Sequence, residues 1–368
     1  MRVLVATIVH HPDDARISRR QIPALLAAGH TVTYLAPWSA TSADVPHGVT
    51  ALDVPQAHGR RRLRAIRTAR GLIREQAATA DLVLLHDLEL VLAVAGMRGR
   101  PPTVWDVHED TAAAVVDKAW LGGPLRPVAR LGVRLFERAA ERRLHLLLAE
   151  DGYAARFRHA HPVVPNAPAV PATVPPSGSD RIVYLGRLSH LRGAHDLVAL
   201  ASRLPDGVRL ELIGQADTRV RPMLLEAHDA GLVVWHRFVP NDRALGMIQG
   251  AAAGVSLLHD APNYRHSLPT KVLEYLANGL PVVTTPNPLA ARIVTEADAG
   301  FEIPYGHVDL AAEAVRRLLA DDAARQRMAD RGRAHVRAHL DWNTLGPEFV
   351  SHLESFAGAA PPSAPTRN

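Results

Sequence analysis

The stretch RIVYLG, residues 181–186, decides the fold, because a strand pattern restarts there directly behind a proline-rich segment. That segment, HPVVPNAPAVPATVPPSGSD at residues 161–180, holds six prolines, which exclude a helix or an interior strand. We therefore expect an extended linker over residues 166–180. With 368 residues the chain is long enough for two domains, which we place at residues 1–165 and 181–336.

Apolar runs typical of buried strands alternate with helical patterns on both sides of the linker. They are RVLVATIV (2–9), TVTYLAP (31–37), DLVLLHD (81–87), TVWDVHE (103–109), RIVYLG, VRLELIG (208–214), VVWHRFV (233–239), AGVSLLHD (253–260) and LPVVTT (280–285). Such strands, separated by helices, are typical of a parallel sheet with helices on both faces. We predict an α/β fold of two Rossmann-like, doubly wound domains that face each other across a cleft. A helix at about 337–358 is expected to pack back on the N-terminal domain, and residues 359–368 to form a disordered tail.

The composition limits the class of protein. Hydrophobic residues make up 47% and charged residues 21%, as in globular proteins, and no apolar run is long enough to cross a bilayer. The N-terminal stretch MRVLVATIVHHPDD indicates a first strand rather than a signal peptide, because its apolar part is short and acids follow it. The chain has no cysteine, which excludes disulfides, thiolate catalysis and cysteine-bound zinc. We expect a cytoplasmic protein.

The net charge of +5 is concentrated in the N-terminal half. Residues 1–165 carry 22 Lys and Arg against 16 Asp and Glu, notably in the basic stretches 59–75 and 125–145. These stretches are interpreted as amphipathic helices with a solvated basic side. A peripheral contact with an anionic membrane surface at the inner face of the membrane, or with an anionic substrate, is the alternative. Nucleic acid is disfavoured, because aromatics are only 5% and no stacking stripe interleaves the arginines.

Polar side chains follow the N-terminal strands at the end where open α/β sheets bind ligands. They are His10, His11, Asp13, Asp14, His86, Asp87, His108, Glu109 and Asp110. A metal site is one interpretation, since His86, Asp87, Glu89, His108, Glu109 and Asp110 are all suitable ligand types. No HExxH or comparable spacing accompanies them, so we expect no metal and no other cofactor.

Two stretches of the C-terminal half combine features of an anion site. In YLGRLSHLRG (184–193), Gly186 frees the backbone near a ligand, and Arg187 and Arg192 are planar cations suited to phosphate oxygens. In HSLPTKVLEY (266–275), Pro269 suits the first position of a helix, and the first-turn N–H groups and dipole of that helix attract phosphate. Lys271 adds a positive charge in that turn, and Glu274 could accept hydrogen bonds from sugar hydroxyls.

Together these stretches resemble the GT-B-fold retaining glycosyltransferases of family 4, the bacterial group 1 enzymes. Arg187 falls where that family has its donor-phosphate arginine, and Arg192 where it usually has lysine. Glu274 matches the second glutamate of the family's Glu, seven residues, Glu signature, which holds the ribose; at the first glutamate this chain has His266. The resemblance implies a donor site formed by Gly186, Arg187, Arg192, His266, Ser267, Leu268, Pro269, Thr270, Lys271 and Glu274.

The N-terminal segments VHHPDDARI (9–17), HDLEL (86–90) and WDVHEDTAAAVVDKAWL (105–121) resemble acceptor-side loops of the same family. The resemblance implies an acceptor side formed by His10, Asp14, Arg16, His86, Asp87, His108 and Glu109. It also implies catalytic roles for His108, near the reacting sugar, and for Arg187 and Arg192, on the leaving diphosphate.

The implied reaction is transfer of a sugar from a nucleotide diphosphate sugar to a hydroxyl acceptor, with retention of anomeric configuration and without metal. UDP is favoured over GDP, and the acceptor is a saccharide, a lipid-linked molecule or a small molecule. Cell-surface polysaccharide, glycolipid or secondary-metabolite biosynthesis is the expected setting. A nucleotide-sugar 2-epimerase of the same fold and a non-catalytic nucleotide-sugar-binding protein remain alternatives. A dehydrogenase is disfavoured, because neither first strand is followed by GxGxxG.

Overall fold

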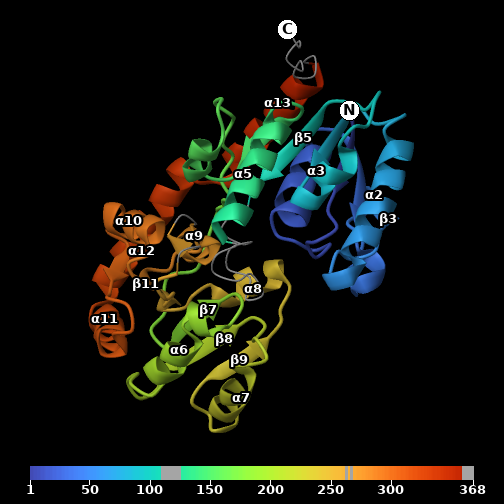
Figure 1. Cartoon of the computed structure of the whole chain (residues 1–368). Helices are drawn as coiled ribbons and strands as arrows, with labels where there is room; N and C mark the ends of the chain where they lie inside the picture. Colours follow the sequence, from blue (N-terminus) through green and yellow to red (C-terminus); the bar gives the residue numbers. More distant parts are fainter. Residues whose placement is uncertain (109–125, 262–263, 266–267, 359–368) are drawn as a thin grey trace. The chain divides into compact units, whose positions relative to one another are not determined.

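The structure is a computed structural model that describes residues 1–108, 126–261, 264–265 and 268–358 (Figure 1). The chain forms two compact units. The first holds Met1–Asn166 and the C-terminal residues from Asn343, and the second holds Ala167–Trp342. Each unit contains one six-stranded parallel sheet, which confirms the predicted α/β class.

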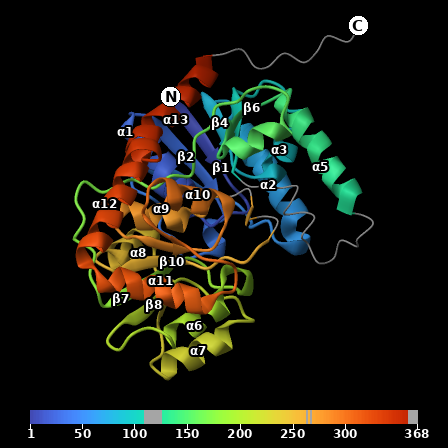
Figure 2. The same cartoon turned by 90° about the vertical axis from the view of Figure 1, so that its left-hand side faces the viewer.

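The first sheet has the strand order β3-β2-β1-β4-β5-β6, all parallel. Its strands are β1 (Arg2–Ala6), β2 (Thr31–Ala36), β3 (Val49–Asp53), β4 (Leu82–Leu85), β5 (Thr103–Val107) and β6 (His145–Leu148). The helices of this unit are η1 (Ile17–Gln21), α1 (Ile22–Ala27), η2 (Trp38–Ala40), η3 (Gly59–Arg61), α2 (Arg62–Gln76), α3 (Leu88–Val94), α5 (Arg126–Glu141), η5 (Asp151–Arg156) and α13 (Trp342–Gly358). The helices α2, α3 and α5 cover one face of the sheet, and α1 and α13 the other (Figure 2).

The second sheet has the order β12-β11-β10-β7-β8-β9, again all parallel. Its strands are β7 (Arg181–Leu185), β8 (Arg209–Ile213), β9 (Val234–Arg237), β10 (Ala253–Ser256), β11 (Val282–Thr284) and β12 (Gly300–Glu302). Its helices are η6 (His190–Arg192), α6 (Ala194–Ala201), α7 (Arg221–Asp229), α8 (Asn241–Ile248), α9 (Thr270–Ala277), α10 (Pro288–Glu296), α11 (Val308–Ala320) and α12 (Asp322–His339).

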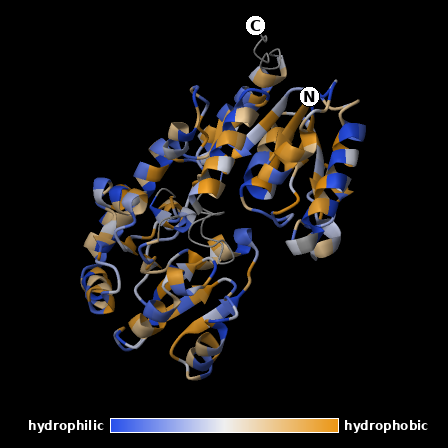
Figure 3. Cartoon of the chain, viewed as in Figure 1, coloured by the Kyte–Doolittle hydropathy of each residue, from blue (hydrophilic) through white to orange (hydrophobic). Residues whose placement is uncertain are grey.

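Strand order reverses once in each sheet. The chain runs outward from β1 to β3 and then returns to the other side of β1 with β4; the second sheet does the same at β7 and β10. At such a point the connections after adjacent strands leave on opposite faces and open a crevice at the carboxyl ends. The strands themselves are largely hydrophobic (Figure 3), because helices cover them on both faces.

The proline-rich segment packs as part of the second unit. All of residues 164–180 are described, and none lies in a helix or strand. Val170 is 4% exposed, and its N–H donates to Asp341 Oδ1 at 3.0 Å. Buried apolar side chains between the prolines therefore anchor the segment.

The C-terminal helix of the first unit begins later than predicted. The helical pattern expected at 337–358 is divided, because α12 ends at His339 and α13 begins at Trp342. The helix α13 packs on the first sheet's unit, where Glu354 lies 3.1 Å from His30 Nε2 and Phe356 stacks on His145. Among the described residues, no helix is both long and apolar enough to span a bilayer.

Candidate active site

The carboxyl end of β7 and the start of α9 meet at one point of the second unit. Gly186 directly follows β7 with a φ of 114°, which favours glycine. A Cβ at this position would lie 3.8 Å from Lys271 Nζ and 4.0 Å from Arg192 Nη1. The missing side chain leaves open the place where these two cations converge.

Lys271 is unusual among the residues between β7 and α9, because its amine is buried. It is only 6% exposed, and its Nζ has no hydrogen-bond partner among the described residues. The amine lies 3.7 Å from the centroid of the Tyr184 ring. Burial, with the charge of Arg192 as a second cause, lowers the pKa of Lys271 well below its ordinary value, although Glu274 acts in the opposite direction. A buried, unpaired amine beside another cation is unfavourable unless an anion joins them.

The first turn of α9 adds a second feature that suits an anion. The sequence predicted Pro269 at the first helical position; instead the helix begins at Thr270 and Pro269 is its N-cap, with extended backbone at ψ 110°. No described side chain caps this helix start. The helix dipole and the N–H groups of the first turn therefore favour an anion at the end of α9 that carries Lys271.

Two tyrosines hold this point in place. The Tyr275 hydroxyl accepts the Leu185 N–H at 2.7 Å and donates to the Val255 carbonyl at 3.2 Å, which ties α9 to β7 and β10. A Cβ on Gly254 would lie 2.2 Å from the Tyr275 ring, so only glycine fits beneath it. The Tyr184 hydroxyl donates to the Arg187 carbonyl at 2.7 Å. The position of Lys271 is thus set by the packing of α9.

The predicted donor residues do not all converge. Gly186, Arg192 and Lys271 come together, and Glu274 lies one turn further along α9 at 5% exposure. Leu268, Pro269 and Thr270 are half-buried before it. The Arg187 side chain is 67% exposed and pairs with Asp217, a partner that the sequence did not reveal. His266 and Ser267 lie outside the described residues.

The acceptor-side residues gather at the switch point of the first sheet. His10 follows β1, His86 and Asp87 follow β4, and His108 follows β5. His10 Nε2 lies 3.1 Å from His108 Nε2 and 3.4 Å from Asp87 Oδ1, and its Nδ1 lies 3.8 Å from Asp14 Oδ2. The predicted Glu109 lies outside the described residues.

His108 is held in one neutral form. Its Nδ1 lies 3.1 Å from the Asp106 carbonyl oxygen, so Nδ1–H donates there and Nε2 accepts from His10. Burial is the main reason that the pKa of His108 falls to about 3; the nearby charges of His10, His86 and Arg16 add to it, and Asp106 opposes it. The imidazole can therefore accept or donate a hydrogen bond, but it carries no charge near neutral pH.

The carboxylate of Asp106, which the sequence interpretation missed, organises this cluster. Arg16 donates to both of its oxygens at 2.7 and 2.8 Å, and Gln21 donates to one of them at 2.8 Å. Burial raises the pKa of Asp106, but Arg16 outweighs it and holds the pKa well below its usual range. The signal in the sequence was an acid inside the otherwise apolar run TVWDV. Arg16, predicted to face the acceptor, is instead 2% exposed and locked to Asp106.

Three side chains of this cluster come close enough for a metal ion. Ligand atoms of His86, Asp106 and His108 lie within 4.8 Å of one another. The fit is poor, because both oxygens of Asp106 already accept from Arg16 and a guanidinium charge stands beside them. These three side chains are therefore a poor match for a metal ion.

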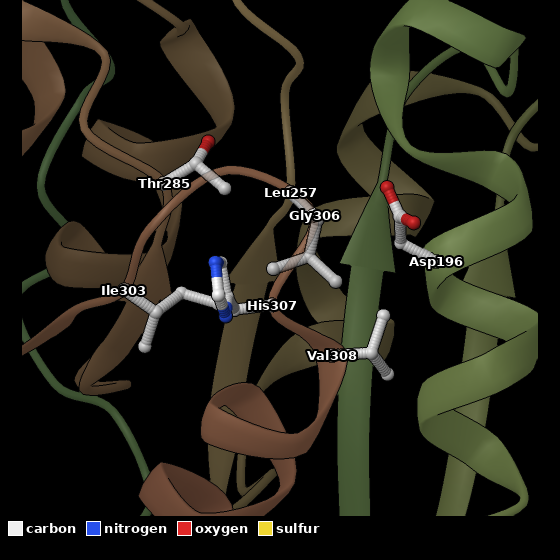
Figure 4. A pocket seen from close by; sticks show the side chains of 7 residues that line it. All are labelled: Asp196, Leu257, Thr285, Ile303, Gly306, His307 and Val308. Carbon is white, nitrogen blue, oxygen red and sulfur yellow. The ribbon is translucent and has the colours of Figure 1, made fainter.

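A separate small cavity lies near the start of α11 (Figure 4). It is lined by Asp196, Leu257, Thr285, Ile303, Gly306, His307 and Val308. Its volume of about 10 Å³ leaves room for one water molecule at most. This cavity is too small to hold a sugar or a nucleotide.

Most of the second unit matches a known protein family. Residues 170–335 match the family model of glycosyl transferases group 1. The glycogen synthase of Mycobacterium tuberculosis is 28% identical over 179 residues, which cover 46% of this chain and 41% of that protein. The chain thus spans less than half the length of this relative.

Two solved structures resemble the whole chain. Sucrose-phosphate synthase from Thermosynechococcus elongatus has a TM-score of 0.75 at 17% identity and covers 97% of this chain and 99% of its own. Anabaena Alr3699/HepE in complex with UDP-glucose has a TM-score of 0.66 at 16% identity, with coverage of 96% and 100%. At such identities the likeness shows the fold, and the two six-stranded sheets are those of the predicted GT-B class.

Proposed function

We propose that the chain is a retaining glycosyltransferase of family 4, which moves a sugar from a nucleotide diphosphate sugar to a hydroxyl acceptor. One observation carries the proposal: the buried amine of Lys271 faces Arg192 and Gly186 with no hydrogen-bond partner among the described residues. This amine lies inside the segment that matches group 1 glycosyl transferases. A diphosphate supplies the charge and the acceptor oxygens that both cations lack.

The difficult part of such a transfer is the departure of the diphosphate. Arg192, Lys271 and the N-terminus of α9 would stabilise the negative charge that develops on it, because they are placed before the reaction begins. Arg187 joins them once it exchanges Asp217 for a phosphate oxygen. These groups take the place that a divalent cation holds in other transferases, so the proposed reaction needs no metal.

The proposed donor is a UDP-sugar. The support is the fold shared with a protein that was solved with UDP-glucose. Glu274 lies one helical turn beyond Lys271, where its carboxylate would accept hydrogen bonds from the ribose hydroxyls. A GDP-sugar is the second choice, because none of these contacts reads the base.

The first unit would bind the acceptor hydroxyl and the transferred sugar. The neutral His108 would hydrogen-bond the sugar, while the leaving phosphate takes the proton of the acceptor on the same face. This same-face route gives retention without a covalent intermediate. The proposed acceptor is a saccharide, a lipid-linked molecule or a small molecule. Each of these fits an enzyme of polysaccharide, glycolipid or secondary-metabolite synthesis in the cytoplasm.

A thermal-shift screen with UDP, GDP, ADP and dTDP tests the nucleotide site. We expect UDP to raise the melting temperature, because a ligand that binds only the folded state stabilises it by mass action. The Lys271→Met variant, which lacks the proposed diphosphate-binding amine, should lose most of that shift. If no nucleotide shifts the melting temperature of the wild-type protein, the proposal is wrong at its base.

Product analysis then separates transfer from the two alternatives. Incubation with a UDP-sugar and a panel of hydroxyl acceptors should give a glycoside whose anomeric configuration is that of the donor. An epimer of UDP-N-acetylglucosamine formed without acceptor would instead show a 2-epimerase. Nucleotide binding without transfer, epimerisation or slow donor hydrolysis would show a non-catalytic binding protein.

A further inference from the structure

We propose that a hollow in the first unit binds an uncharged carbohydrate, and that this carbohydrate is the acceptor. The hollow is lined by His11, Ser39, Ala40, Thr41, Ser42 and Gln56 and has a volume of about 570 Å³. Ligand sites commonly measure about 300–1,000 Å³, so a sugar fits. The inference rests on the proposed transfer: the acceptor oxygen bonds to the anomeric carbon, the bond to the diphosphate breaks, and the hydroxyl proton passes to the leaving phosphate.

The hollow lies at the end of the sheet that carries the histidine cluster. His11 follows His10 of that cluster, residues 39–42 follow β2, and Gln56 follows β3. The strands β1, β2 and β3 are parallel neighbours, so the connections that follow them leave the sheet at the same end. A carbohydrate in the hollow is therefore bound beside the group that we propose hydrogen-bonds the transferred sugar.

The side chains of the hollow offer hydrogen-bonding groups that carry no formal charge. They supply three hydroxyls, an amide and an imidazole, and none of the described lining residues is Lys, Arg, Asp or Glu. His11 Nδ1 accepts the N–H of Asp13 at 3.1 Å, so the Nε2–H of the neutral ring is a donor. No described residue forms a hydrogen bond with the side chain of Ser39, Ser42 or Gln56. These groups are therefore available to a ligand.

The connection after β2 is fixed before any ligand binds. The Ser39 N–H donates to Asp53 Oδ1 at 2.8 Å, and the Thr41 hydroxyl donates to the Trp38 carbonyl at 3.3 Å. The indole N–H of Trp38 in turn donates to the Tyr34 carbonyl at 3.3 Å. Because these contacts hold the backbone of the hydroxyl-bearing residues in place, less ordering is needed when a sugar binds.

An uncharged sugar suits this lining better than a phosphorylated or otherwise anionic acceptor does. Each sugar hydroxyl both donates and accepts hydrogen bonds, as the serine and threonine hydroxyls do. An anion is instead bound by arginine, lysine or a helix N-terminus. The basic stretches 59–75 and 125–145 contribute no described residue to the hollow. The carboxylate that holds its rim, Asp53, would repel an anion.

Saturation-transfer NMR on the full chain tests the hollow without a nucleotide. The probes are the methyl glycosides of glucose, galactose and mannose, and their 6-phosphates. We expect an uncharged glycoside to bind, with the same affinity at low and high salt, because no formal charge is involved. Gln56→Ala should weaken binding about fivefold, the effect of one neutral hydrogen bond. Gln76→Ala is the matched control, since Gln76 is a half-buried glutamine at the end of α2, outside the hollow.

Three results would overturn the inference: no uncharged glycoside binds, only the phosphates bind and high salt weakens them, or Gln56→Ala binds as the wild type does. A UDP-induced thermal shift in the same samples separates this inference from the proposed function. A normal UDP shift without sugar binding sinks only the acceptor class, whereas sugar binding without a UDP shift sinks the nucleotide site. Tighter binding of the octyl than of the methyl glycoside would assign the sugar to a lipid-linked acceptor, and equal binding to a free saccharide.

Discussion

A buried ion pair and a single buried lysine show what individual side chains contribute in this protein. Arg16 and Asp106 form a closed pair in which both carboxylate oxygens accept from the guanidinium. Lys271 is also buried, but its amine has no hydrogen-bond partner in the part of the chain that the structure describes. The ion pair stabilises the unit, whereas the amine of Lys271 is the group that we propose binds the diphosphate. Lys271 is one of only two lysines among 42 basic residues, and an ammonium is compact where the guanidinium of arginine is broad.

Replacing Lys271 with methionine should stabilise the empty protein and weaken nucleotide binding. The folded state lowers the pKa of Lys271, so between that pKa and the unfolded value near 10.4 the unfolded chain binds more protons. Over that window the stability of the wild-type protein rises with pH, and below it the burial cost is fully present. We expect Lys271→Met to raise the melting temperature by a few degrees at pH 7.5, and the difference to shrink toward pH 10. Affinity for UDP should fall about 10- to 100-fold, as for a lost charged hydrogen bond.

Scanning fluorimetry across pH and titration calorimetry with UDP measure both effects. Reductive ¹³C-methylation adds a direct reading, because the chain has two lysines and the variant assigns their signals. An ordinary lysine pKa in the empty protein would contradict the burial that we describe.

Replacing Asp106 with asparagine should be strongly destabilising. The change leaves Arg16 buried without a charged partner, which costs about 3–5 kcal/mol. Asp81→Asn is the matched control, because it breaks a solvent-exposed pair with Arg2 and should cost no more than about 1 kcal/mol. Urea unfolding of the three proteins checks the difference. Because Asp106 has a depressed pKa in the folded state, its contribution persists at neutral pH and is lost only as the pH falls below its usual range. Equal losses in the two variants would mean that the buried pair is no more important than a surface one.

At the level of helices and strands, the candidate donor site depends on how closely α9 approaches β10. Tyr275 of α9 fits over Gly254 of β10 and bonds the end of β7 through its hydroxyl. This packing fixes the place of Lys271. Because the interior is closely packed, a change in the contact between Tyr275 and Gly254 shifts the helix α9 as a whole.

Gly254→Ala should therefore damage the site without touching a charged residue. The added methyl group meets the Tyr275 ring and forces α9 away from β10, at a cost of about 1–3 kcal/mol. We expect UDP affinity to fall as well, because Lys271 moves with α9. Gly71→Ala in α2 is the control, since a Cβ there meets nothing within 4 Å and alanine favours a helix by about 0.5–1 kcal/mol. Melting curves and UDP titration measure the stability and the UDP affinity of both variants. Unchanged UDP affinity in Gly254→Ala would mean that the packing of α9 on β10 does not position the nucleotide site.

The whole molecule divides the proposed work between two units that each have a core of their own. One apolar cluster surrounds Trp105 in the first unit, and two others lie on the two faces of the second sheet. The cations proposed for the diphosphate all belong to the second unit, and the histidine cluster belongs to the first. Each set lies at the switch point of its own sheet.

Removal of metal ions should leave the proposed reaction intact. The charge on the diphosphate is met by side chains and a helix terminus, and Arg16 already occupies the carboxylate of the one metal-compatible group among the described residues. We expect turnover after treatment with EDTA to stay within about twofold of the untreated enzyme. Loss of activity that added Mg²⁺ or Mn²⁺ restores would show that a cation completes the site.

Local sequence patterns predicted much of the fold. Apolar runs such as RVLVATIV and RIVYLG formed β1 and β7, because a strand covered on both faces needs apolar side chains at every position. The strands β3, β6 and β12 were not predicted. All three are edge strands; β3 and β12 are only partly buried and β6 is only four residues long, so none stands out as a long apolar run. The residue types of the anion site were also visible, since cations beside a helix start suggest phosphate.

The partners of those residues depended on contacts between distant parts of the chain. Arg16 meets Asp106 across 90 positions, and Arg187 meets Asp217 across 30. The helix α5 has an amphipathic sequence, yet its acids face inward because Arg156 and the backbone after η5 receive them. Periodicity along a chain reports which residues share a face. Whether that face meets a charge, a core or solvent is settled by what the folded chain brings opposite to it.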